Sequence, residues 1–234
     1  MKFYNLARGN VLQIFGDIGA GGLDEAAFRA ELDKVAGASL EVEINSPGGD
    51  VFAALAIYNM LKASGKAVTT RVMGVAASAA SVIALAGDKR EMPKNTFLMI
   101  HNASASASGT GAALRKAAAA LEKVESALVA IYVKTTGMPE ATLRAMLAAE
   151  TWLTADEAKD KGFATVVTDE INASASFDLV RAKLPPRVRA TYAPRAANRT
   201  TAKPTAPGGR EAIWASRHAQ TDRPLASVKP TARR

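Results

Sequence analysis

The sequence predicts an α/β fold with a largely parallel sheet. Apolar segments with the two-residue alternation of strands recur within residues 11–100, and segments with helical spacing separate them. Glycine and proline stand at the ends of several of these segments, where turns are expected. Strands that alternate with helices in this way form crossover units, which place neighbouring strands parallel.

The expected elements follow one another with short connections. Phe28, Leu32 and Val35 share one face of a helix, Gly74 is expected to turn the chain, and Gly137 is expected to close the longest helix. In chain order we expect a strand over 11–15, a helix over 25–35, a strand over 40–44, a helix over 51–64, a strand over 67–73, a helix from about Ser78, a strand over 96–100 and a helix over 111–136.

Charge divides the 234-residue chain into two expected parts, a body over 1–183 and a tail over 184–234. The tail holds eleven Lys and Arg against two acidic residues, together with seven of the ten prolines, whereas the body holds 19 basic and 20 acidic residues. The formal net charge of +8 therefore comes from the tail. A segment so rich in Pro, Ala and Arg buries too little apolar surface to order itself, so we expect it to be disordered.

Composition excludes several classes of protein. The chain has no cysteine, which rules out disulfide frameworks, thiol catalysis and zinc fingers, and its two histidines, His101 and His218, leave little room for a metal site. We expect no metal or other cofactor. Residues 1–8 lack the apolar region of a secretory signal, and the apolar run over 72–86 is too short to span a bilayer. These features predict a cytoplasmic protein without a membrane partner.

Two candidate catalytic residues follow predicted strands. Ser78 begins a helix after the small residues of 74–77, and His101 directly follows the strand over 96–100. Taken alone, Ser78 is more typical of a helix N-cap, and a lone histidine is more often a surface or core residue. Ligands of parallel α/β sheets bind at the carboxyl ends of strands, however, and histidine is the usual base for a serine nucleophile. Together, the two residues favour nucleophilic chemistry.

A third loop, Asn45–Asp50, contains Pro47-Gly48-Gly49. Two glycines allow the main chain to turn an N–H group inward instead of into the sheet. With the N–H of Ala79, at the start of the helix after Ser78, this arrangement would form a two-donor oxyanion hole. An ordinary turn between a strand and a helix is the alternative interpretation.

Four segments carry a family resemblance: Ile44-Asn45-Ser46-Pro47-Gly48-Gly49, Gly74-x-Ala76-Ala77-Ser78, Met99-Ile100-His101 and Trp152-Leu153-Thr154-Ala155-x-Glu157-Ala158-x-x-x-Gly162. Their order and approximate spacing resemble those of the Clp protease proteolytic subunit, over roughly residues 10–169. Three shorter features are most similar to the phage and prophage branch, whose members act in head maturation. These are Gly-Asp-Ile-Gly from Gly16, Ala54-Ile57-Tyr58-Asn59 and Glu150-Thr151-Trp152-Leu153.

The resemblance implies a superhelix of βαβ units, a fold shared with crotonase-like proteins, and serine endopeptidase activity. By the family pattern, Ser78 is the nucleophile and His101 is the general base. The family's acid lies two residues before the aromatic residue of its aromatic-Leu-Ser/Thr-Ala motif. This chain has Glu150 there, where the family usually has Asp. If Glu150 points away, a water or a main-chain carbonyl would hold the imidazole.

The resemblance also implies the groups that surround the reacting bond. Gly49 and Ala79 would supply the N–H groups of the oxyanion hole. Gly48, Gly49 and Asn102 are expected to bind the substrate, which would be a peptide or protein.

Family members assemble into rings, commonly of seven subunits, that enclose their active sites. The helix over 111–136, with the loop over 103–109 before it, resembles the element through which such rings stack; a helix packed on its own sheet is the alternative. The sequence has no phosphate-binding Gly-x-x-x-x-Gly-Lys-Ser/Thr loop, so ATP-driven unfolding would require a separate ATPase. A head-maturation protease would instead meet a capsid or scaffold protein.

Other readings stay open at this level. A relative of enoyl-CoA hydratase shares the fold class and a similar oxyanion hole, but it does not require Ser78 and His101. The Ser–Lys signal-peptide-digesting family carries a similar Ser-Pro-Gly-Gly turn, but it is membrane-associated. An inactive scaffold whose basic tail binds nucleic acid is a non-enzymatic alternative.

The tail prompts a hypothesis of its own. Its abrupt change in charge and proline content, after a complete catalytic body, suggests a targeting segment that docks the protease inside an assembling capsid and is removed by self-cleavage. The protein would then act in the host cytoplasm or the procapsid interior.

Overall fold

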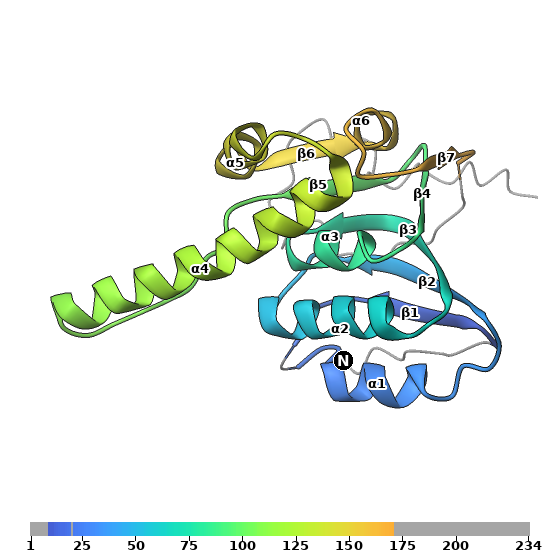
Figure 1. Cartoon of the computed structure of the whole chain (residues 1–234), viewed down its shortest axis with the longest axis horizontal. Coiled ribbons are helices and arrows are strands. Elements are labelled where there is room, and N and C mark those ends of the chain that lie inside the picture. Colours follow the sequence, from blue (N-terminus) through green and yellow to red (C-terminus); the bar gives the residue numbers. More distant parts are fainter. Residues whose placement is uncertain (1–8, 20, 171–234) are drawn as a thin grey trace, which may run out of the picture. The chain divides into compact units, whose positions relative to one another are not determined.

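The computed structural model describes residues 9–19 and 21–170 (Figure 1). The tail predicted at 184–234 lies outside the described residues. The strands are β1 (Val11–Phe15), β2 (Ser39–Ser46), β3 (Ala67–Ala77), β4 (Lys89–Pro93), β5 (Phe97–Ile100), β6 (Thr151–Thr154) and β7 (Val166–Thr168). The helices are α1 (Glu25–Leu32), α2 (Val51–Ala63), α3 (Ala79–Ala84), α4 (Gly111–Thr136), α5 (Glu140–Ala148) and α6 (Ala155–Asp160).

The prediction of an α/β fold with a largely parallel sheet is confirmed. Within the described residues, the strands form one sheet in the order β1-β2-β3-β4-β7, and β5 pairs with both β3 and β6. Every pair is parallel except β5 with β6. Helices α1, α2 and α3 follow one another along one face of this sheet (Figure 1), as successive crossover units require.

Strand β3 is the central strand of the sheet and pairs with β2, β4 and β5. Its first half pairs with β4 at Thr69–Arg71 and its second half pairs with β5 at Val75–Ala77, so the sheet divides along this one strand. The predicted turn at Gly74 is wrong, because β3 continues to Ala77. At the irregularity in the β2–β3 pairing, the buried side chain of Asn45 accepts the Val75 N–H at 3.2 Å, which satisfies the strand where the ladder shifts.

Capping residues set the helix ends close to the predicted positions. The Asp50 carboxylate accepts two N–H groups of the first turn of α2, each at 2.8 Å, and Thr110 caps α4. Gly137 ends α4 in the left-handed conformation with a φ of 73°, as the sequence predicts. Helix α1 ends at Leu32 instead of Val35, although Val35 is still buried in the core.

Helix α4 combines an exposed and a buried half. Its first turns project away from the sheet (Figure 1), and Leu114 is 43% exposed there. Its last turns are buried through Leu128, Val129 and Tyr132, which pack into the core beside α3 and α5. Among the described residues, no helix has the length and apolar character required to cross a membrane.

Candidate active site

Ser78 lies between β3 and α3 in a strained backbone conformation. Its φ of 54° and ψ of −125° fall outside the regions that residues with a side chain ordinarily occupy. The Ser78 N–H donates to the Met99 carbonyl at 2.9 Å, so the turn begins while the chain is still paired with β5. Ser78 occupies the N-cap position of α3, but its hydroxyl makes no capping hydrogen bond. The N-cap interpretation therefore does not explain this serine.

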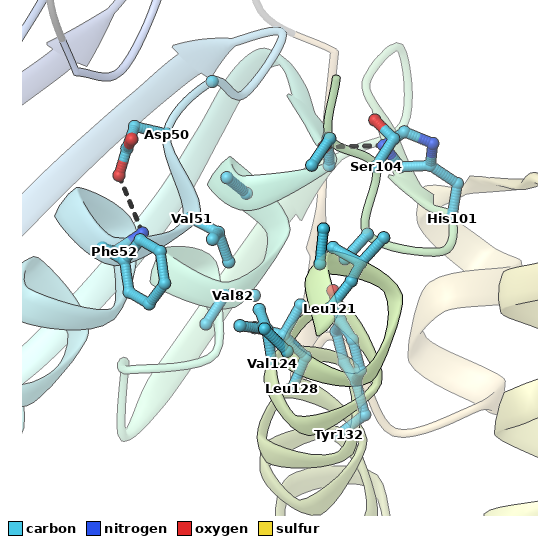
Figure 2. A pocket seen from close by; sticks show the side chains of 17 residues that line it. Asp50, Val51, Phe52, Val82, His101, Ser104, Leu121, Val124, Leu128 and Tyr132 are labelled. Atoms are coloured by element: carbon cyan, nitrogen blue, oxygen red, sulfur yellow. Dashed lines mark hydrogen bonds between the residues drawn. The ribbon is translucent and has the colours of Figure 1, made fainter. Parts of the chain in front are cut away.

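The Ser78 hydroxyl instead meets His101. The Ser78 Oγ and His101 Nε2 atoms lie 2.7 Å apart, drawn as the dashed line to His101 in Figure 2. This contact follows from the sheet, because Ala77 of β3 is paired with Met99 of β5 and the two chains leave the sheet at the same edge. Both residues are half-buried, so the pair is sheltered and still reachable from solvent.

The glycine turn at the end of β2 packs directly against the Ser78 turn. A Cβ atom on Gly48 would lie 2.7 Å from the Ala77 carbonyl oxygen, 2.8 Å from the Ser78 Cβ and 2.9 Å from the Ala79 nitrogen. A Cβ atom on Gly49 would collide with the Ile18 carbonyl oxygen. These contacts explain why both positions are glycine, and the positive φ values of 100° and 142° agree with them.

The main chain of Ile18 fixes this glycine turn. Its N–H donates to the Gly48 carbonyl and its carbonyl accepts from the Asp50 N–H, each at 2.9 Å. Gly49 and Ala79 both line the pocket beside the Ser78 hydroxyl. Ala79 is the first residue of α3, and the first N–H groups of a helix have no partner within it.

Glu150 lies beside His101 in the order of the sheet, but its carboxylate has another partner. The antiparallel pairing of β5 with β6 sets Ile100 opposite Thr151, so the next residues outward are His101 and Glu150. Glu150 has a positive φ of 48°, and its Oε1 accepts from Trp152 Nε1 at 3.4 Å, a long hydrogen bond. Among the described residues, the His101 ring is hydrogen-bonded to Ser78, whereas the Glu150 carboxylate is hydrogen-bonded to Trp152.

An apolar pocket of about 570 Å³ opens beside the Ser78–His101 pair. Figure 2 shows its two sides, with Val51 and Phe52 from the start of α2 facing the side chains of α4. The side chains on α4 recur at helical spacing, and Tyr132 is the last of them. The larger apolar side chains of the lining are Val51, Phe52, Val82, Leu121, Val124 and Leu128.

The sequence pattern alone does not predict this pocket. The helix over 111–136 was predicted, but its period alone does not say which face lines a pocket and which face meets the sheet. Asn102, expected to bind substrate, is exposed and lies outside the described pocket lining; its N–H donates to the Leu147 carbonyl at 3.2 Å. Phe52 is 66% exposed at the pocket rim, an unusual position for an aromatic side chain.

A largely parallel α/β sheet in which a strained serine at a strand end is hydrogen-bonded to a histidine at the end of the paired strand is typical of hydrolases that use a serine nucleophile. The Clp protease family model matches residues 32–171 of this chain. That match covers more than half of the sequence, and the chain belongs to the Clp protease family.

Individual relatives agree with this assignment. The chain is 38% identical over 123 residues to the ATP-dependent Clp protease proteolytic subunit 1 of Chlamydia caviae, covering 51% of this chain and 64% of that protein. It is 38% identical over 121 residues to subunit 3 of Rhodococcus jostii, covering 51% and 60%. It is 35% identical over 133 residues to the ATP-dependent Clp protease proteolytic subunit of Deinococcus radiodurans, a match that covers 56% of this chain and 65% of that protein. The chain thus spans less than two thirds of the length of each of these relatives.

Proposed function

We propose that this protein is a serine endopeptidase in which Ser78 is the nucleophile and His101 is the general base. The observation that carries the proposal is the 2.7 Å contact between Ser78 Oγ and His101 Nε2, on a strained turn that opens into an apolar pocket. Strained backbone persists where the surrounding structure holds it, and such positions cluster at functional sites.

The proposed reaction uses only groups of this chain and water. Ser78 Oγ attacks the carbonyl carbon of a peptide bond while its proton passes to His101 Nε2. The tetrahedral intermediate collapses, the C–N bond breaks, and His101 returns the proton to the leaving amine. A water molecule then gives a proton to His101 and attacks the acyl-enzyme. The bond between the acyl carbon and Ser78 Oγ breaks, His101 passes its proton to Ser78 Oγ, and the carboxylic acid is released.

The Gly49 and Ala79 N–H groups are the proposed oxyanion hole. Both residues line the pocket next to Ser78, and the packing of Gly48 on the Ala79 nitrogen keeps the two turns at a fixed separation. Donors held in place before the reaction stabilise the developing negative charge without reorganisation. Gly49 and Ala79 are also the two residues to which the family resemblance assigns this role.

Glu150 is the proposed third member of the triad. Its position opposite His101 at the end of the β5–β6 pairing supports this role. The 3.4 Å contact to Trp152 Nε1 is long, so a side-chain rotation that exchanges it for His101 Nδ1 costs little. A carboxylate there would hold the imidazole in one tautomer and stabilise the imidazolium formed during attack.

Hydrolysis of fluorogenic peptides by purified full-length protein tests the assignment of the pair. Ser78→Ala and His101→Ala are each expected to lower kcat/KM by at least about 10³-fold, because each removes a member of a unit that acts together. Ser126→Ala, which removes a hydroxyl on the exposed side of α4, is the matched control and should leave the rate unchanged. Hydrolysis that survives Ser78→Ala would refute the proposal.

A second comparison tests Glu150. Glu150→Gln is expected to lower kcat by about 10³- to 10⁴-fold, since an amide cannot stabilise the imidazolium. Glu150→Asp restores the carboxylate and should recover a large part of the rate. If Glu150→Gln retains nearly full activity, another group orients His101.

The pocket predicts which peptide side chains the protein accepts beside the cleaved bond. Its lining is apolar apart from Asp50, Ser104, the reacting pair and the Tyr132 hydroxyl, which is hydrogen-bonded to Ser81, so it suits a large apolar side chain next to the cleaved bond. Val124→Asp places a charge in the pocket and should reduce cleavage after leucine or phenylalanine by about 10- to 100-fold, because the loss of one apolar contact and a buried charge both disfavour binding. Ser126→Asp adds the same charge on the exposed side of α4 and is expected to have little effect.

For the biological role, we propose the maturation of phage or prophage heads by cleavage of a capsid or scaffold protein. The three short motifs shared with that branch and the basic tail support this role. The alternative is a general Clp-type subunit that works in a ring with a separate ATPase, which the names of the relatives from Chlamydia caviae and Deinococcus radiodurans favour.

Digestion with and without an ATPase separates these two roles. A head-maturation protease should cleave assembled capsid or scaffold protein at a few sites without ATP. A general Clp-type subunit should degrade a folded protein only when a Clp ATPase and ATP are added. Native mass spectrometry of the full-length protein would give the number of subunits in the proposed ring. Deletion of residues 184–234 tests whether the tail directs packaging into procapsids.

A further inference from the structure

A chain of two buried hydroxyl groups connects helix α4 to the carbonyl group of Ser78. The Ser81 Oγ lies 2.6 Å from the Ser78 carbonyl oxygen and 2.7 Å from the Tyr132 Oη. Ser81 lies in α3 and has no exposed surface, while Tyr132 lies in α4 and is 2% exposed. Fifty-one positions therefore separate two hydroxyls that are in direct contact.

The direction of these hydrogen bonds follows from the chemistry of the groups. A carbonyl oxygen only accepts, so the single hydroxyl proton of Ser81 goes to the Ser78 carbonyl. The Tyr132 hydroxyl must then donate to Ser81 Oγ. Burial raises the pKa of Tyr132 to about 12, an effect that its hydrogen bond with Ser81 only partly opposes, so the phenol keeps the proton that this bond requires.

The Ser78 peptide groups are held on both sides. On the N-terminal side, the Ser78 N–H donates to the Met99 carbonyl at 2.9 Å. On the C-terminal side, the Ser78 carbonyl accepts from both the Ser81 N–H, at 3.0 Å, and the Ser81 hydroxyl, at 2.6 Å. A φ of 54° and a ψ of −125° require such support, because the chain relaxes to an ordinary conformation when its neighbours allow it.

Tyr132 is a firm anchor for this chain of hydroxyls. Its ring packs against Phe163 with centroids 6.0 Å apart and an angle of 56° between the planes. The Thr136 hydroxyl donates to the Tyr132 carbonyl at 2.7 Å. Tyr132 also lines the apolar pocket on the α4 side (Figure 2), so one residue bounds the pocket and supports the Ser78 turn.

We propose that Ser81 and Tyr132 are positioning residues for the Ser78 nucleophile, acting in series from Tyr132 Oη through Ser81 Oγ to the Ser78 carbonyl. This inference rests on the proposed function of Ser78. Neither hydroxyl is hydrogen-bonded to Ser78 Oγ or to His101. Their role is to keep the strained turn in the one conformation that aims Ser78 Oγ at His101 and at the carbonyl carbon of a substrate.

The rate at which a fluorophosphonate modifies Ser78 tests this role. The probe reacts with an activated serine, and intact mass spectrometry with peptide mapping follows the adduct. Tyr132→Phe deletes one oxygen atom and Ser81→Ala deletes the last member of the chain. Each is expected to lower the saturating labelling rate about two- to tenfold, the range expected for one neutral hydrogen bond, with little change in the probe concentration at half-saturation.

Matched controls separate this effect from a general loss of stability. Tyr58→Phe removes the hydroxyl of a buried tyrosine in α2, and Ser126→Ala removes a hydroxyl that donates to a main-chain carbonyl of α4. Both should label at the rate of the unaltered protein even if their melting temperatures fall. A purely structural role for Tyr132 predicts the same pattern for Tyr132→Phe.

The double variant tests the series arrangement. Because Tyr132 acts through Ser81, Tyr132→Phe should have little further effect in a protein that already carries Ser81→Ala. Independent, multiplicative effects, or folded single variants that label at the full rate, would overturn the inference while the labelling of Ser78 still supports the proposed function. Absence of labelling in the folded unaltered protein would overturn the proposed function itself, and this inference with it.

Discussion

Replacement of Gly48 by alanine should inactivate the site while the protein stays folded. The new Cβ atom would lie 2.7 Å to 2.9 Å from the Ala77 oxygen, the Ser78 Cβ and the Ala79 nitrogen, where ordinary contacts begin at 3.4 Å. The neighbours must therefore yield by about 0.5–0.7 Å, and two of the three atoms belong to Ser78 and its proposed oxyanion donor. A displacement of about 1 Å can cost about 100-fold in rate, so we expect a loss of about 10- to 100-fold in kcat.

Gly137→Ala is the matched control for the backbone effect. Gly137 also has a positive φ, 73°, but no atom lies within 4 Å of the position its Cβ would take. The left-handed conformation costs an alanine about 1–2 kcal/mol, whereas overpacking at Gly48 adds about 1–3 kcal/mol. Both variants should therefore melt at lower temperature, with Gly48→Ala the lower of the two.

Peptide hydrolysis and thermal unfolding, measured on the same preparations, decide the matter. Gly137→Ala should keep the kcat of the unaltered protein, whereas Gly48→Ala should lower kcat about 10- to 100-fold at temperatures well below its melting point. A Gly48→Ala protein with unchanged kcat would refute the close packing of the glycine turn on the Ser78 turn.

Two further predictions concern stability. The pKa of Glu91 is lowered from 4.5 because, although burial raises it, hydrogen bonds from Lys89 and Arg71 favour the ionised form more strongly. The ionised carboxylate therefore stabilises the fold above about pH 4.5, and this contribution is lost as the pH falls through the lower pKa of the folded state. Glu91→Gln should lower stability by about 1–2 kcal/mol at pH 7 in denaturant titrations, with the difference shrinking below pH 4.5; a constant difference would contradict the sign. Thr154→Ala removes a capping box shared with Glu157 at the start of α6 and should cost about 1 kcal/mol without altering kcat, and a lower kcat would show that α6 influences the site.

The candidate site could be predicted largely because it depends on where strands end. Ser78 and His101 each follow a run of buried, strand-forming residues, and parallel pairing places such ends at one edge of the sheet. The glycines of the third loop were recognisable for a similar reason, since Gly48 and Gly49 need a conformation that other residues avoid. Strand ends and glycine turns depend on neighbouring residues in the chain, so local sequence is enough to predict them.

The error at Gly74 has a long-range cause. A glycine after a strand pattern is a common turn, but here the strand continues because the Asn45 side chain satisfies the Val75 N–H. Asn45 lies thirty positions from Val75 in the chain, so the sequence around Gly74 does not predict this hydrogen bond. The position of Glu150 also has a long-range cause, because the pairing of the four-residue strand β6 with β5 sets Thr151 opposite Ile100, one residue before His101.

The hydrogen bonds that hold the Ser78 turn could not be predicted from local sequence either. Ser81 is one of several serines among alanines, and Tyr132 has the spacing of an ordinary core residue of α4. Their interaction can be recognised only in the folded structure, where α3 and α4 pack together and the two hydroxyl oxygens lie 2.7 Å apart. Apolar side chains of α4 such as Val124 and Leu128 likewise line the pocket because of how the helix is rotated, which its period does not specify.

The central claim is that Ser78 is a nucleophile activated by His101. Its most direct test is the treatment of folded full-length protein with a fluorophosphonate, followed by intact mass measurement, beside Ser78→Ala and His101→Ala. The account predicts a single adduct, mapped to Ser78, that is absent from Ser78→Ala and forms at least about 10³-fold more slowly in His101→Ala. An adduct that persists without Ser78, or labelling of Ser78 that does not depend on His101, would contradict it.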